Sequence, residues 1–234
     1  MSFLTQEDIQ GFAYSFLLLG SILIIARLLT HVDGISPEAV RKFIHISISN
    51  WWFILSNYFS GLWQSLTGPI LFIIVNSLAT FLDWVRFFGM NDRTRNYGLI
   101  HFPLSLAILI ILQHFNIITE YMTGIAVLIM GYGDGLAALL GKKFGVSKIH
   151  PLVGKKTYVG SFTMLITSIF IMVFFSELYQ LGWATSFSGI SIILITAIVA
   201  TLLEVLTPFG LDNLSVPIGT ALSLKLLIPL DNVD

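Results

Sequence analysis

The chain has 234 residues, of which 56% are hydrophobic and 11% are charged, with a net charge of −1 and no cysteine. Soluble domains carry roughly 25% charged residues, so this composition, with a mean hydropathy of +0.88, excludes a soluble protein and predicts a polytopic membrane protein. The nearly neutral charge argues against a nucleic-acid partner, and the lack of cysteine excludes disulfides, thiolate metal sites and cysteine nucleophiles.

Charge-free segments predict an all-α bundle of seven or eight transmembrane helices that forms a single domain over residues 1–234. The first span covers residues 9–26. Residues 43–82 contain no Asp, Glu, Lys or Arg, which is enough for two spans of about 20 residues each. The break between these two spans is predicted from turn-forming residues: Asn57, Gly61, Gly68 and Pro69. Further spans are predicted at residues 97–115, 118–140, 158–176 and 187–206, with a shorter element at 214–230.

Basic residues alternate between the loops. Eleven of the 12 Lys and Arg residues flank the loops after the first, third and fifth spans, and only Lys225 lies elsewhere. The positive-inside rule therefore places these loops, and the loop after the seventh span, in the cytoplasm, with the N-terminus outside. The first residues, MSFLTQED, are acidic and lack a basic n-region, so no signal or transit peptide is predicted.

The first cytoplasmic loop carries Arg41, Lys42 and His45 at the start of a predicted helix. Residues three and four apart share one face of a helix, so the imidazole lies beside the two cations. This arrangement suits a phosphate clamp. The alternative is a membrane-end anchor with snorkelling cations.

Asp134 is an ionisable residue within apolar sequence, and such residues are expensive in a membrane and usually functional. It lies between Gly133 and Gly135, which would let the helix open or let a ligand approach the backbone. A carboxylate close to Lys142 and exposed backbone amides suits Mg²⁺ with a polyphosphate. The alternative is that Asp134 only pairs with a lysine or arginine inside the bundle.

The same loop continues with Gly154, Lys155, Lys156 and Thr157, which opens the next helix. The segment lacks the earlier glycine of a soluble P-loop and follows no strand. Backbone amides and the helix dipole can still hold phosphate there.

The loop after the seventh span adds further oxygen ligands. Glu204 is a second acid within a predicted span, and like Asp134 it is expected to be functional because an ionisable residue is costly there. Asp212 and Asn213 follow it; their alternative interpretation is a simple turn.

These motifs resemble those of the CTP-dependent lipid-alcohol kinases, which include dolichol, phytol and farnesol kinases and the diacylglycerol kinases that use CTP. That family is related to the phosphatidate cytidylyltransferases. The matching segments occur in the family's order and extend over about residues 41–217. They are Arg41-Lys42-x-x-His45, Gly133-Asp134-Gly135, Gly154-Lys155-Lys156-Thr157 and Leu211-Asp212-Asn213.

The resemblance implies a cytoplasmic active site that uses CTP and Mg²⁺ to phosphorylate a lipid alcohol presented by the membrane. Asp134, with Asp212 or Glu204, would hold the metal, and Lys155 and Lys156 would bind phosphate. Arg41, Lys42 and His45 would bind phosphate or orient the acceptor hydroxyl.

One position departs from the family pattern. Val159 stands where the family usually has Glu, so the role of that acid is lost or passes to another acid such as Glu204. The sequence leaves the acceptor open among phytol, farnesol, a polyprenol or dolichol, and diacylglycerol. It also leaves the oligomeric state open.

Two other functions remain as alternatives. A cytidylyltransferase that makes a CDP-lipid would share the nucleotide, the metal and the bundle, but it would release pyrophosphate instead of CDP. A potassium channel is suggested by Gly131-Tyr132-Gly133-Asp134, which matches a selectivity filter. The residues before it are Ile129 and Met130, and five lysines follow it, which argues against a cation pore.

Overall fold

The computed structural model describes residues 4–84, 97–149, 156–208 and 210–228, and the described residues form helices and no strand. Lys148 and Thr157 form an isolated antiparallel bridge in the loop between two helices.

The helices follow one another in this order: α1 Gln6–Leu29, α2 Pro37–Ser49, α3 Trp51–Tyr58, α4 Leu62–Phe81, α6 Gly98–His114, α7 Glu120–Leu128, the π-helical turn η2 Ile129–Asp134, α8 Gly135–Phe144, α9 Tyr158–Leu178, the 3₁₀ turn η4 Gly182–Thr185, α10 Phe187–Leu206 and α11 Asp212–Leu227. This confirms an all-helical membrane protein. Five of the segments are long and apolar enough to span a membrane: residues 6–29, 62–81, 120–144, 158–178 and 187–206.

Local side-chain chemistry fixes several helix starts. Thr5 and Asp8 form a reciprocal capping box at the start of α1. Ser36 caps α2, with Pro37 at the first helical position. Thr157 and Ser186 cap α9 and α10 in the same way, each accepting a hydrogen bond from the backbone three residues ahead.

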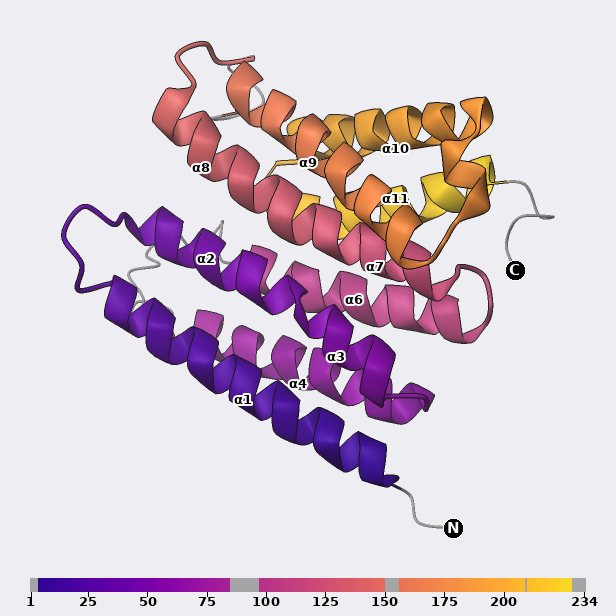
Figure 1. The fold of residues 1–234 in the computed structure, drawn as a ribbon. Coiled ribbons are helices and arrows are strands. Elements are labelled where there is room, and N and C mark those ends of the chain that lie inside the picture. Colours follow the sequence, from indigo (N-terminus) through magenta and orange to yellow (C-terminus); the bar gives the residue numbers. More distant parts are fainter. Residues whose placement is uncertain (1–3, 85–96, 150–155, 209, 229–234) are drawn as a thin grey trace.

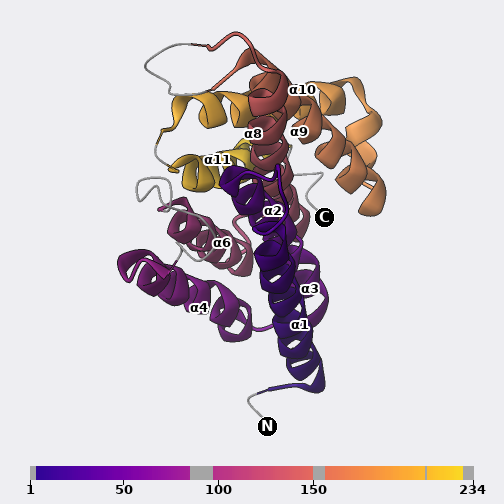
Figure 2. The ribbon, with the colours of Figure 1, turned by 90° about the vertical axis from the view of Figure 1, so that its left-hand side faces the viewer.

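The continuous segment α7–η2–α8 forms the centre of the bundle (Figure 1). In the apolar 18-residue stretch of this segment 72% of the residues are buried inside the protein, whereas in the corresponding stretches of α1 and α4 only 11% and 17% are buried. Helices α2 and α9 both pack against it, while α1 packs on α2 and α3, and α4 packs on α6. Figure 2 shows α4, α6 and α11 lying beside one another on one side of this centre.

The predicted break between the second and third spans is wrong in its extent. The chain turns at residues 59–61, and Gly68 and Pro69 both lie inside α4. Pro69 is tolerated there because neighbouring helices compensate for an interrupted helix in a membrane protein. Gly68 lies against the ring of Trp51, where a side chain would not fit. Its role is therefore close packing between α3 and α4.

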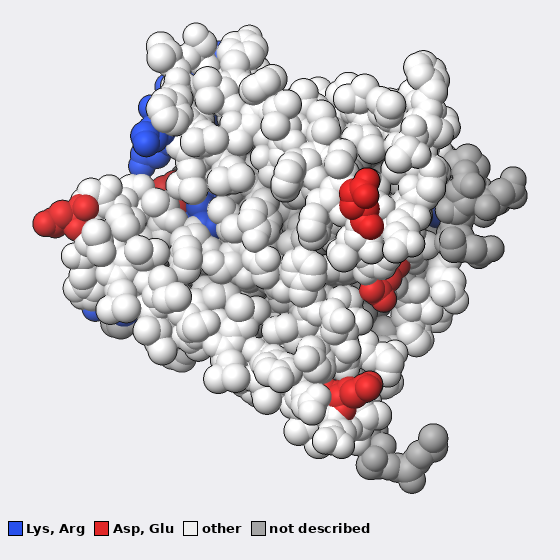
Figure 3. All heavy atoms as spheres, viewed as in Figure 1, with Lys and Arg blue, Asp and Glu red and all other residues white. Residues whose placement is uncertain are grey.

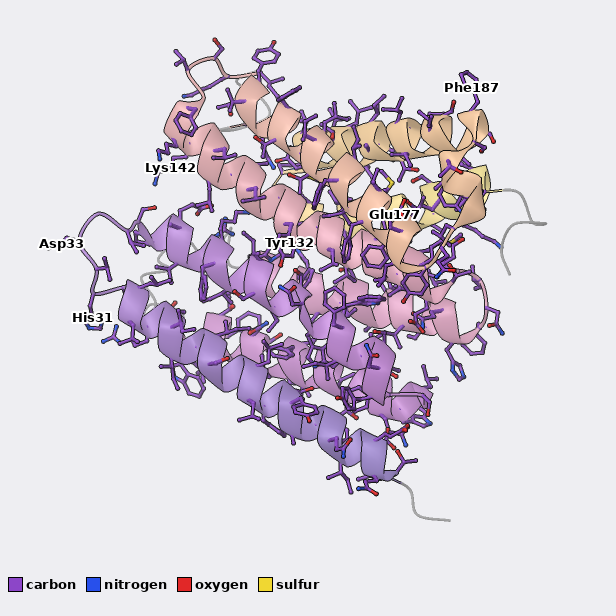
Figure 4. The ribbon with its side chains drawn as sticks, in the orientation of Figure 1. His31, Asp33, Tyr132, Lys142, Glu177 and Phe187 are labelled. Carbon is purple, nitrogen blue, oxygen red and sulfur yellow. The ribbon has the colours of Figure 1, made fainter. Side chains whose placement is uncertain are left out.

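The second span is itself divided at Asn50, between α2 and α3. The Asn50 amide donates a hydrogen bond to the Ile46 carbonyl (2.9 Å), and Tyr132 Oη donates one to Asn50 Oδ1 (3.0 Å). Tyr132 lies near the middle of the bundle (Figure 4). The polar groups at this break are therefore satisfied within the protein, as an apolar environment requires.

The two ends of the bundle differ in charge. On the face in Figure 3, Lys and Arg gather at the end with the α1–α2 and α8–α9 loops, where acidic groups also lie, while the charged groups seen towards the opposite end are mostly acidic. Lys142 and Glu177 mark the two ends in Figure 4. Arg86, Arg93, Arg95 and Lys155 contribute to the predicted charge pattern but lie outside the described residues.

The charge distribution predicts which end faces the cytoplasm. Because the chain has no cysteine, single cysteines can be introduced at Ser147, an exposed residue after α8, and at Thr185, an exposed residue after α9. We expect a membrane-impermeant maleimide to label Thr185→Cys in intact cells and Ser147→Cys only after permeabilisation. The reverse labelling pattern would show that the opposite end of the bundle faces the cytoplasm.

Candidate functional site

Three carboxylates from three helices converge at the basic end of the bundle. Asp134 ends η2, Glu204 lies near the end of α10, and Asp212 begins α11. One carboxylate oxygen of each residue lies within 4.8 Å of the others. Asp134 and Glu204 are each only 4% exposed. We call these three residues the carboxylate cluster.

Two lysines neutralise most of the charge of the carboxylate cluster. Lys42, which is 6% exposed on α2, forms an ion pair with Asp134. Lys156, just before α9, forms an ion pair with Glu204 and another with Asp212, whose Oδ2 lies 3.1 Å from Lys156 Nζ. The Lys42–Asp134 pair joins residues 92 positions apart in the sequence, and the Lys156–Glu204 pair joins residues 48 positions apart. Pairing of this kind is what allows ionised groups to be buried.

Lys156 lies outside the membrane-spanning segments, and its charge state follows from its surroundings. Burial disfavours its charged form, but the attraction of Asp212, Glu204 and Asp134 is stronger, so the pKa of Lys156 is raised. The ammonium group therefore remains charged at neutral pH. It can pair with a carboxylate or with a phosphate.

His45 lies beside the carboxylate cluster, with Nε2 3.8 Å from Asp134 Oδ2. Its ring lies close to the Met130 backbone and packs against Phe102 at a centroid distance of 4.8 Å. Nε2 is buried and has no hydrogen-bond partner. Neither neighbour could be predicted from the sequence, because contacts with a backbone group or with a phenylalanine have no sequence motif.

Glycines allow the central segment to approach its neighbours. A side chain at Gly131 would meet Ser49 of α2, one at Gly133 would meet Met164 of α9, and one at Gly135 would meet Ile46 of α2. The predicted opening of the helix at these glycines corresponds to the π-helical turn η2. Side chains of α2 and α9 fill the space beside them, so helix packing explains these glycines without a ligand.

Residues before α9 and α11 place the outer members of the site. Thr157 Oγ1 accepts a hydrogen bond from the Gly160 amide (3.1 Å) and lies against Gly141. This fixes the chain next to Lys156. His101, for which no role was predicted, hydrogen-bonds the Gly210 carbonyl through Nδ1 (3.0 Å). It thereby anchors the turn that precedes Asp212.

The structure brings together six of the predicted site residues: Lys42, His45, Asp134, Lys156, Glu204 and Asp212. Arg41 lies one residue away from Lys42 and pairs with Glu38 (2.7 Å). Asn213 is buried, and its amide donates to the Gly210 carbonyl (3.3 Å).

The other predicted residues lie elsewhere. Lys142 is exposed near the end of α8 and forms no ion pair with a described residue (Figure 4). The Thr157 hydroxyl serves as a helix cap. Gly154 and Lys155 lie outside the described residues. The Gly131–Asp134 segment, compared above with a channel filter, is π-helical, so its carbonyls do not form the extended lining of a pore.

The donor set of the carboxylate cluster fits a hard divalent cation. Mg²⁺ is bound through oxygen, usually with one or two carboxylates plus substrate phosphates and water. Asp134, Glu204 and Asp212 offer three carboxylates within reach of one ion. The two lysines that pair with them have the charge needed to bind the phosphates of a nucleotide.

Similarity to known proteins covers most of the chain. A phytol kinase of Synechocystis sp. is 26% identical over 211 residues, covering 87% of this chain and 85% of that protein. Phytol kinase 1 of Arabidopsis thaliana, a chloroplast protein, is also 26% identical, over 83% of this chain and 68% of its own length. A probable chloroplast phytol kinase of Glycine max is 30% identical, with coverages of 82% and 68%.

The chain belongs to the phytol kinase family. This confirms the resemblance to the lipid-alcohol kinases. No protein-family model matches the chain, and no solved structure matches it.

The ion pair between Lys42 and Asp134 generates a prediction about stability. Removing one partner of a buried ion pair costs about 3 kcal/mol or more, because the other charge remains buried. We therefore expect Lys42→Met to lower the free energy of unfolding in detergent by about that amount, and Lys42→Met combined with Asp134→Asn to be more stable than Lys42→Met alone.

Lys142→Met is the matched control, because Lys142 is an exposed lysine at the same end of the bundle. It should leave the unfolding midpoint unchanged. Equal midpoints for Lys42→Met and Lys142→Met would show that the buried ion pair does not stabilise the fold.

Proposed function

We propose that this protein is a CTP-dependent kinase that transfers the γ-phosphoryl group of CTP to the hydroxyl of a membrane lipid alcohol at the cytoplasmic face. The observation that carries the proposal is the buried carboxylate cluster with its two paired lysines, in a chain of the phytol kinase family. Phytol is the first acceptor to test because of the names of the relatives.

In the proposed site, Asp134, Glu204 and Asp212 hold Mg²⁺. When bound, the ion neutralises negative charge on the triphosphate, which is the main requirement of phosphoryl transfer. Glu204 brings a carboxylate to the cluster from α10, in a chain that has Val159 where related kinases usually have Glu. This geometry favours the view that Glu204 supplies the missing acid.

The cations of the site bind the phosphates. Lys42 and Lys156 lie directly against the carboxylate cluster, so both reach a triphosphate bound there. Arg41 and Lys155 adjoin them in the sequence and add positive charge. The start of α9 contributes backbone amides at a helix N-terminus, which favours anions.

His45 orients the acceptor. With its proton on Nδ1, a neutral imidazole presents the lone pair of the unpartnered Nε2. An acceptor nitrogen cannot donate to a phosphate, but it can accept a hydrogen bond from the lipid hydroxyl. The hydroxyl oxygen then attacks the γ-phosphorus, CDP leaves, and the hydroxyl proton is released.

The lipid alcohol reaches the site from the bilayer. Exposed apolar side chains cover the outer helices, among them Leu17 and Ile24 of α1 and Ile74 of α4. These surfaces solvate any long-chain alcohol, so the acceptor is selected close to the hydroxyl and not by the outer faces.

Product analysis tests this function. Purified protein in detergent receives Mg²⁺, either CTP or ATP, and in turn phytol, farnesol, a polyprenol, diacylglycerol and phosphatidate. We expect CDP together with a phosphorylated alcohol, with phytol as the preferred acceptor. Pyrophosphate with a CDP-lipid would identify a cytidylyltransferase instead. A product with ATP but not CTP would overturn the choice of nucleotide.

Removing one carboxylate tests the proposed metal site. We expect Glu204→Gln to lower turnover by about 100-fold, the usual effect of losing one preorganised charged group, and to raise the Mg²⁺ concentration needed for half-maximal rate. Glu177→Gln removes an exposed acid at the opposite end of the bundle and should leave both values unchanged. An unchanged Mg²⁺ dependence in folded Glu204→Gln would remove Glu204 from the metal site.

A further inference from the structure

A cavity of about 240 Å³ lies at the end of the bundle opposite the carboxylate cluster. The end of α3, the start of α4, the end of α6 and the start of α7 surround it. In Figure 1 these elements meet at the right-hand end, where the α3–α4 turn and the α6–α7 loop lie. The phosphoryl-transfer chemistry proposed above makes no use of this cavity.

The walls of the cavity carry negative charge without a compensating cation. Neither Lys nor Arg is among the lining residues, and Glu120 supplies a carboxylate. Glu120 Oε1 accepts a hydrogen bond from Tyr179 Oη (2.7 Å). Among the described residues, no lysine, arginine or histidine nitrogen forms an ion pair with Glu120, although His114 lines the same cavity.

A second acceptor in the lining is also unsatisfied. Gln113 Oε1 is buried and has no hydrogen-bond partner, and a buried acceptor of this kind calls for a donor. The hydroxyls of Ser56, Ser60 and Ser65 add further acceptors.

We propose that this cavity binds a primary ammonium group. The uncompensated carboxylate and the lack of lysine and arginine exclude a phosphate or another anion as the group held there. A primary ammonium has three N–H donors, which match Glu120, Gln113 and a serine hydroxyl. A quaternary ammonium has none. The aromatic rings of Trp52 and Phe59 in the lining are compatible with a cation.

Two sources can supply this chemistry to a membrane protein: the ethanolamine headgroup of a phospholipid, or a soluble amine. The size of the cavity suits a headgroup and not a whole drug-sized ligand, for which pockets of roughly 300 Å³ or more are usual. This binding is independent of the kinase activity, because the cavity and the carboxylate cluster lie at opposite ends of the bundle.

Thermal unfolding of the purified protein in detergent tests the proposal. The probes are dihexanoyl phosphatidylethanolamine, its phosphatidylcholine and phosphatidylglycerol counterparts, and free ethanolamine. We expect the ethanolamine lipid to raise the unfolding midpoint in a saturable manner, while the choline and glycerol lipids do not. A shift with free ethanolamine but not with the lipid would assign the cavity to a soluble amine.

Variants connect the shift to the cavity. Glu120→Gln keeps an acceptor for Tyr179 and should raise the apparent Kd for the bound amine by about tenfold or more, the usual effect of losing a hydrogen bond to a charged group. Gln113→Leu should weaken binding in the same direction. Because Gln113 Oε1 has no partner in the free protein, its loss should not impair folding.

Glu177→Gln is the matched control, since Glu177 is an exposed acid at the same end as the cavity (Figure 4). It should bind the amine as the unmodified chain does. Equal shifts with all three lipids, no shift with any amine, or an unchanged Kd in folded Glu120→Gln would each overturn the proposal.

Discussion

The need to neutralise buried charge organises this structure. In an apolar bundle an isolated carboxylate or ammonium is too costly, so Asp134, Glu204 and Asp212 require Lys42 and Lys156. These ion pairs tie α2, η2, α10 and α11 to the start of α9 at one end of the molecule. The geometry of the site is thus part of the stability of the fold, and the groups that would receive a metal and a triphosphate are held in place before either arrives.

Close helix contact makes that charge pairing possible. The π-helical turn and its glycines bring the central segment against α2 and α9, so Lys42 and Lys156 reach the carboxylate cluster from different sides. Small residues at helix contacts are the usual means of close approach in membranes, where no hydrophobic effect drives helices together. Gly160, next to the Ala137 carbonyl and Gly141, serves the same purpose between α8 and α9.

Much of the fold could be predicted from the sequence, because charge and hydropathy act locally. The predicted span at 187–206 coincides with α10, and the spans at 9–26, 97–115, 118–140, 158–176 and 214–230 differ from their helices by a few residues, whereas the second span is divided into α2 and α3. The break near Pro69 was misplaced because a proline pattern does not say whether neighbouring helices compensate. The acids Asp134 and Glu204 were identifiable from their cost in a membrane, but their pairing with Lys42 and Lys156 depends on packing. The contributions of Met130 and His101 are backbone contacts that no residue pattern encodes.

The order of the charged groups along the chain has a consequence for biosynthesis. Lys42 enters the membrane with α2, but its partner Asp134 follows 92 residues later, and Asp212 belongs to the last described helix. During synthesis Lys42 is therefore present before its partner, and its charge stays unpaired with Asp134 until the central segment has been made. The site is completed only when α11 packs against the bundle, because a chain that stops before α11 lacks Asp212 and leaves Lys156 with one carboxylate fewer.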